Sequence, residues 1–149
     1  MTAKFETLVV VADGGGARAF QERRRHGPLD EMADWAETAP ESERHGSGAH
    51  GGTVYGRAGS GRSNIYSAAP AVAAEQKFLS RFADRINRAA TAGEFTSLVL
   101  IAPPKALGIL REGLNPAAYG RIEVSDAHDR MIETADDLRL RLRSLRVPD

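Results

Sequence analysis

The chain has 149 residues, no cysteine, and twenty basic against twenty acidic side chains, so its formal net charge is zero. The missing cysteine excludes disulfides, a thiolate metal site and a cysteine nucleophile. A balanced charge argues against a protein that binds nucleic acid over its whole surface. The length predicts a single domain over residues 1–149. No apolar run reaches membrane-spanning length and the chain start lacks a signal peptide's basic segment, so we expect a cytoplasmic protein without membrane contact.

The first third of the chain predicts three strands. Residues 5–12 form an apolar, β-branched run that stops at Asp13-Gly14-Gly15-Gly16. This pattern predicts a buried strand and a hairpin turn, with residues 17–23 as the returning strand. A phosphate-binding loop is the weaker interpretation of the glycines, because a strand follows them and the usual glycine spacings are missing. Residues 29–36 predict a third strand at the sheet edge, with a short helix as the alternative.

The second half of the chain alternates helices and strands. Residues 71–92 predict an amphipathic helix, with Pro70 in its first turn and Gly93 just past its end. Residues 97–102 form a continuous apolar run, typical of a strand that is covered on both faces.

The remaining elements follow with shorter connections. We predict a short helix over residues 105–112 and a strand over residues 121–126. Thr134 and Asp137 predict a capping box that starts a last helix. The Leu-Arg alternation from residue 138 to residue 143 also fits a strand.

The order of these elements predicts the fold. Three consecutive strands predict an antiparallel meander, and strands separated by helices predict parallel neighbours joined by right-handed crossovers. The result is a mixed α/β sheet of the ribonuclease-H-like kind, with the strand over 5–12 beside that over 97–102. We expect one core, made by Val9, Val10, Val11, Val99, Leu100, Ile101, Leu79, Phe82 and Ile86.

A long segment without periodicity, at about residues 38–70, is the best functional candidate. We expect a flexible loop there, rich in glycine and arginine, and no acidic residue occurs from Arg44 until Glu75. Arginine forks suit phosphate, and Tyr55 or Tyr66 could stack on a base. The alternative is a tolerated insertion without function.

The residues also resemble a known family. LVVVADGGGARAF, EQKFLSRFADRINRAATAGEF and LVLIAPPKALGILREGL, together with the glycine- and arginine-rich insert, resemble the bacterial host attachment proteins. That family is counted among relatives of the archaeal and eukaryotic class I release factors, whose middle domain carries a Gly-Gly-Gln loop before its first long helix. Here Gly51 and Gly52 are followed by Thr53 in place of Gln.

The resemblance implies contact with ribosomal or transfer RNA rather than with DNA. It puts peptidyl-tRNA hydrolysis in doubt and implies neither a cofactor nor a metal. The rival interpretation is a protein-interaction or regulatory module that influences attachment to surfaces or hosts indirectly. The residues expected to contact RNA are Arg44, His45, Gly51, Gly52, Thr53, Tyr55, Arg57 and Arg62.

Other chemistry is less well supported by the sequence. A metal-dependent nuclease would need converging carboxylates, for which Asp13, Glu75 and Asp126 are the candidates, but Asp13 fits a turn residue better. Two arginine-rich faces are interpreted as solvated helix surfaces that could extend an RNA contact. They comprise Lys77, Arg81, Arg85 and Arg88 on one predicted helix, and Arg139, Arg143 and Arg146 on the last.

Overall fold

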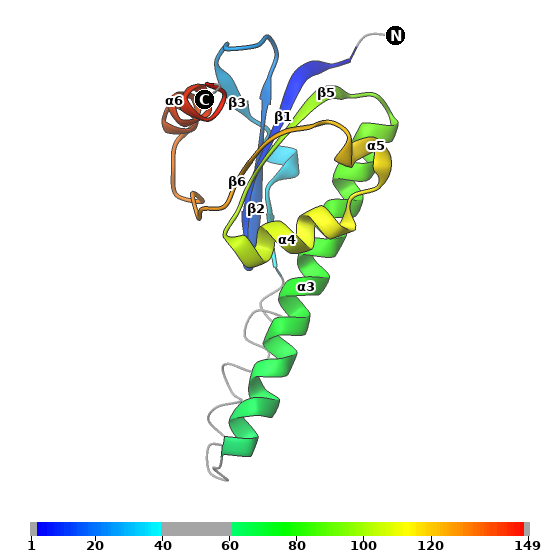
Figure 1. Ribbon diagram of the computed structural model, residues 1–149, viewed down its shortest axis with the longest axis vertical. Coiled ribbons are helices and arrows are strands. Elements are labelled where there is room, and N and C mark those ends of the chain that lie inside the picture. The colour runs from blue at the N-terminus through cyan, green and yellow to red at the C-terminus, as the bar shows by residue number, and fades with distance from the viewer. Residues whose placement is uncertain (1–2, 40–60, 148–149) are drawn as a thin grey trace.

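The computed structural model of the protein describes residues 3–39 and 61–147, with side chains in the second stretch from residue 72 onward. The described part is a mixed α/β fold with a six-stranded sheet and four α-helices (Figure 1). The strands are β1 (Phe5–Asp13), β2 (Gly16–Glu22), β3 (Leu29–Glu31), β4 (Glu37–Thr38), β5 (Phe95–Ile101) and β6 (Ile122–Asp126). The helices are α3 (Gly61–Thr91), α4 (Pro104–Gly113), α5 (Pro116–Tyr119) and α6 (Ala135–Leu145), with a 3-10 turn, η1 (Ala33–Trp35).

The sheet order is β3-β2-β1-β5-β6, and β4 pairs with the start of β2, whereas β3 pairs with its end. β1 is antiparallel to β2 and parallel to β5, and β6 is parallel to β5. Val9 lies opposite Val99 in the β1–β5 pair, so the prediction that these two segments are neighbours is confirmed. Both strands are buried on both faces, as their continuous apolar runs predicted.

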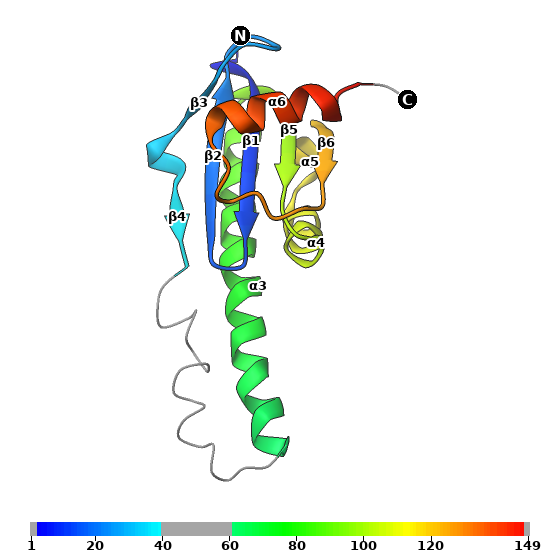
Figure 2. The same ribbon diagram turned by 90° about the vertical axis from the view of Figure 1, so that its left-hand side faces the viewer.

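Helices cover both faces of this sheet (Figure 2), and they divide the apolar interior in two. Successive side chains of a strand point to opposite faces. Val10 therefore packs with Phe82 on the face of α3 and α4, whereas Val9 packs with Leu138 and Leu142 of α6. The expectation of one core was wrong for this reason.

The long helix begins earlier than predicted. α3 starts at Gly61, so Pro70 lies inside it and the last ten residues of the predicted loop are helical. Alanines on both sides of Pro70 favour helix strongly, which explains why one proline does not set the start. The other end was predicted correctly: Gly93 takes a φ of 72°, which is unfavourable for other residues.

The shorter elements follow the sequence more closely. The segment over residues 29–36 contains both predicted alternatives, because β3 is followed by η1. The Thr134–Asp137 capping box is present and α6 is a helix, which settles the ambiguity of the Leu-Arg alternation. The four-residue helix α5 was missed, although its Asn115 cap and Pro116 start are visible in the sequence.

Two glycines make a matched pair of stability predictions. Gly108 lies in the middle of α4 with open space around its Cβ position, so Gly108→Ala is expected to stabilise by about 0.5–1 kcal/mol. Gly93→Ala also meets nothing within 4 Å, but its positive φ should make it destabilising by about 1 kcal/mol. Urea unfolding measures both, and equal effects would contradict the conformational argument.

Candidate functional site

The sequence-predicted site lies almost entirely outside the described residues. Arg44, His45, Gly51, Gly52, Thr53, Tyr55 and Arg57 belong to residues 40–60. Arg62 is in the first turn of α3, and its side chain is likewise outside the described part. The structure fixes the two points between which this segment runs, Ala39 and Gly61.

Both points lie at the same end of the sheet. Before the segment, β4 pairs with the start of β2, and Ala39 N–H donates to the Gly15 carbonyl at 2.9 Å. After the segment, α3 begins well beyond the sheet edge and runs back along the sheet face (Figure 1). The segment over residues 40–60 thus starts beside the β1–β2 turn, where the parallel strands β1, β5 and β6 have their carboxyl ends, and it ends at the projecting start of α3. Ligands of α/β sheets are commonly bound at such an edge.

The β1–β2 turn at this end is built around Asp13. Its Oδ1 accepts hydrogen bonds from Gly15 N–H at 2.8 Å and Gly16 N–H at 2.9 Å, so the prediction of a turn residue is confirmed. Gly14 lies against α3, because a Cβ built there would be 2.5 Å from the Glu75 carboxyl carbon. The Glu75 carboxylate in turn lies 4.0 Å from Lys105 Nζ at the start of α4. The β1–β2 turn, α3 and α4 thus converge beside the point where residues 40–60 leave the sheet.

A second charged cluster follows the carboxyl end of β6. Asp126 is only 5% exposed, and its two oxygens accept from His128 Nδ1 at 2.7 Å and from Arg130 Nε at 2.6 Å. Burial alone would raise the pKa of Asp126, but the hydrogen bonds from Arg130 and His128 outweigh burial and hold it below its usual value. Asp126 is therefore a carboxylate that fixes the loop after β6.

The sequence indicated Asp126 only as a candidate metal ligand, and its pairing with His128 and Arg130 was not predicted. Asp126, His128 and Arg130 are spaced two residues apart in SDAHDR, a signal that could have been noticed. The loop after β6 then lies beside β2, where the Arg18 guanidinium donates to the carbonyls of Met131 and Glu133. Arg18 also forms a two-pronged ion pair with Glu31 of β3.

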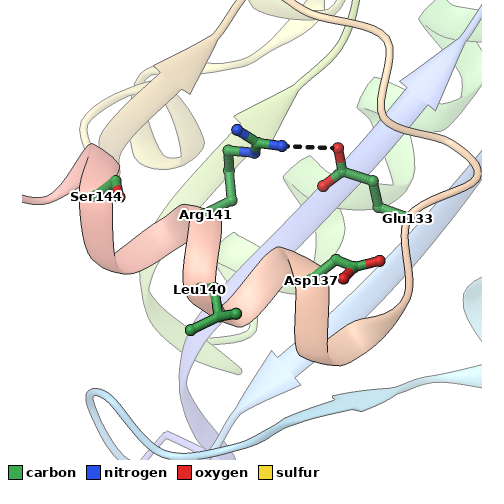
Figure 3. Close-up of a pocket in the computed structure, with 5 residues that line it drawn as sticks. All are labelled: Glu133, Asp137, Leu140, Arg141 and Ser144. Carbon is green, nitrogen blue, oxygen red and sulfur yellow. Dashed lines mark hydrogen bonds and ion pairs between the residues drawn. The ribbon is translucent and has the colours of Figure 1, made fainter.

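A pocket of about 440 Å³ lies alongside α6 next to this loop (Figure 3). It is lined by Glu133, Asp137, Leu140, Arg141 and Ser144. Arg141 donates to Glu133 at 3.1 Å, and Arg130 donates to the same carboxylate at 3.2 Å. The charges on the pocket wall therefore pair with each other, which makes it a poor site for an ion of either sign.

The nuclease candidates do not converge. Asp13 caps its own turn, Glu75 lies beside Lys105, and Asp126 is engaged by His128 and Arg130. Within residues 3–39 and 61–147 there is no group of three or more His, Asp or Glu side chains arranged to hold a metal ion.

These features define a mixed α/β fold in which a long glycine-rich segment joins β4 to α3. The chain matches a family described as "protein required for attachment to host cells" over residues 8–142, and it belongs to that family. This bears out the family named in the resemblance. No characterised protein matches the sequence closely. None of the helices in the described part combines the length and the apolar composition needed to cross a bilayer.

Proposed function

We propose that this host attachment family protein binds ribosomal or transfer RNA through the segment that joins β4 to α3, and that it does so without hydrolysing an ester. An effect on attachment to host cells would then be indirect, through translation. The binding residues in this proposal are those expected from the sequence, centred on Arg44, Arg57 and Arg62.

The proposal includes a finer assignment of the fold. We assign the sheet to the ribonuclease-H-like class, on which the parallel with release-factor middle domains depends. In support, the antiparallel strands β1, β2 and β3 come first in the chain, and β5 and β6 are then added in parallel next to β1. The insertion before the first long helix occupies the same topological place as the Gly-Gly-Gln loop.

One observation carries the RNA-binding proposal. The stretch from Arg44 to Ala74 contains basic residues and no acidic one, and it is attached at one end of the sheet. Its last part is the start of α3, which extends past the sheet edge (Figure 2). The arginines of this stretch therefore have no acidic neighbour after them in the sequence before Glu75, and Glu75 already has Lys105 beside it. Such a stretch suits phosphate contacts.

Catalysis is not part of the proposal. In the release-factor comparison, Thr53 stands where the loop has Gln, and Thr offers no side-chain amide. The described carboxylates at this end, Asp13 and Asp126, are engaged in hydrogen bonds that hold the turn and the loop after β6. We therefore expect binding rather than turnover.

Sedimentation with purified ribosomes tests this function. The protein should pellet with ribosomes at roughly 50 mM salt and be released by roughly 200 mM, because phosphate contacts weaken steeply with salt. Absence of the protein from the pellet at the lower salt would reject the proposal, and so would binding that salt leaves unchanged. Capture of protein partners alone would favour the rival interaction module.

A further inference from the structure

Two basic segments that are far apart in the sequence meet at the other end of the sheet. The β2–β3 turn carries Arg23, Arg24 and Arg25, and α6 carries Arg139 and Arg143. Arg139 Nη2 donates to the backbone carbonyl of His26 at 2.9 Å, which joins the helix to the turn. Both segments lie at the end away from the projecting start of α3 (Figure 2).

Two acidic side chains in this region, Glu22 and Glu123, are held in ion pairs. Glu22 has 2% of its side chain exposed and accepts from Arg146 at 2.7 Å. Glu123, with 20% exposed, accepts from Arg146 at 3.0 Å and from Arg25 at 2.8 Å. These two acids therefore pair with Arg146 and Arg25, and not with Arg23, Arg24 or Arg143.

The outer arginines are left without counter-charges. Arg23, Arg24 and Arg143 are exposed, and none of them forms an ion pair with a residue in the described part of the chain. Asp30, the first acid after Arg23 and Arg24 in the chain, points to the opposite sheet face from Leu29, which packs toward α6. A zero net charge for the whole chain thus conceals a locally positive surface.

We propose that Arg23, Arg24, Arg139 and Arg143, here called the arginine patch, form a second RNA-contacting surface that binds the phosphate backbone. This inference rests on the proposed function and adds a second contact to it. Arginine is the side chain that best matches phosphate, through its planar fork of donors.

The apolar surface of α6 argues for RNA rather than a lipid headgroup. A helix that lies in a membrane interface needs a broad apolar face. Leu138 and Leu142 are instead buried against the sheet, and only Leu140 and Val147 remain outward on this helix and its end.

The length of α3 bears on the kind of RNA. α3 has 31 residues and is about 46 Å long, so its start at Gly61, where the segment from β4 joins it, lies several tens of ångströms from the arginine patch (Figure 2). With about 3.4 Å per base step along a strand, this distance corresponds to roughly a dozen or more steps. A folded RNA such as tRNA or ribosomal RNA spans that distance, and a short oligonucleotide does not.

The test uses the full chain and labelled tRNA in a salt titration. The patch variant is Arg24→Gln with Arg143→Gln. Its matched control is Lys4→Gln with Arg111→Gln, which removes the same charge from exposed positions beside Glu94 and Tyr119. We expect the patch variant alone to bind about tenfold more weakly and to flatten the slope of log affinity against log salt by about 1.4 to 1.8. Thermal unfolding should be unchanged, since both arginines are exposed.

The outcomes separate this inference from the proposed function. If Arg44, Arg57 and Arg62 matter and the patch does not, the inference fails and the proposed function stands. If the patch matters and those three arginines do not, the inference stands and the proposed site fails. Absence of any tRNA binding by the native protein rejects both. Binding to phosphatidylserine vesicles instead of tRNA, lost in the patch variant, would overturn RNA as the ligand.

Discussion

Phe82→Ala is expected to lower the free energy of unfolding by about 3–5 kcal/mol. Phe82 is fully buried on the inner face of α3, and its ring meets that of Trp35 edge-on at a centroid distance of 5.9 Å. Truncation leaves a cavity between helix and sheet, and it also removes the support for η1, which leads into β4. Denaturant unfolding measures the loss.

The matched control for Phe82 lies on the same helix. Val72 is 42% exposed, so Val72→Ala should change the free energy of unfolding by less than about 0.5 kcal/mol. A cost below roughly 1 kcal/mol for Phe82→Ala would mean that this helix face is not the one packed on the sheet.

Arg146→Met is expected to cost about 3–5 kcal/mol at neutral pH, because it leaves two carboxylates without their partner. The Arg146 side chain is 5% exposed and donates to Glu22 and Glu123 as well as to Thr7. Arg143→Met on the same helix is the control, and it should be nearly neutral because Arg143 is exposed. Similar losses in the two variants would contradict a specific role for the buried cluster.

The pH dependence gives this prediction a second readout. Burial alone would raise the pKa of Glu22, but hydrogen bonds from Arg146, Thr7 and the His26 backbone outweigh it and hold the pKa below its ordinary value. A lowered pKa contributes stability above about pH 4.3, which is lost as the pH falls further. Without Arg146, burial dominates and favours the protonated acid. The stability gap between native protein and variant should therefore narrow on acidification, and a constant gap would count against the cluster.

Much of the fold was predictable because its signals are local. The valines of β1, the apolar run of β5 and the Thr134–Asp137 box each specify their own element. The start of α3 was not predictable from Pro70, since the alanine-rich sequence around it continues the helix. The division of the core also required knowing that α6 covers the second sheet face, because the pattern of β1 shows only that both faces are buried.

The candidate site, like the fold, was predictable from the sequence only in part. Composition indicated the glycine- and arginine-rich insertion, and the structure adds that it starts beside the β1–β2 turn and ends at the start of α3, which projects from the same end of the sheet. The sequence indicated Arg139 and Arg143 on one helix, but not their meeting with Arg23 and Arg24, because the bond from Arg139 to His26 joins segments more than one hundred residues apart. The interpretation of Arg146 as part of a solvated helix surface was wrong, because Arg146 at the C-cap of α6 is buried in ion pairs, whereas Arg143 on the helix is exposed.

The central claim is that the insertion binds RNA through arginine–phosphate contacts, and the most direct test is the salt dependence of tRNA affinity. Replacing Arg44, Arg57 and Arg62 together with alanine should weaken binding and flatten the slope of log affinity against log salt by about two to three units. Thr53→Ala should change neither, because it removes no charge, and the native protein should hydrolyse peptidyl-tRNA only at background rate. Salt-independent binding that the triple substitution leaves intact would contradict the account, as would robust hydrolysis that Thr53→Ala abolishes.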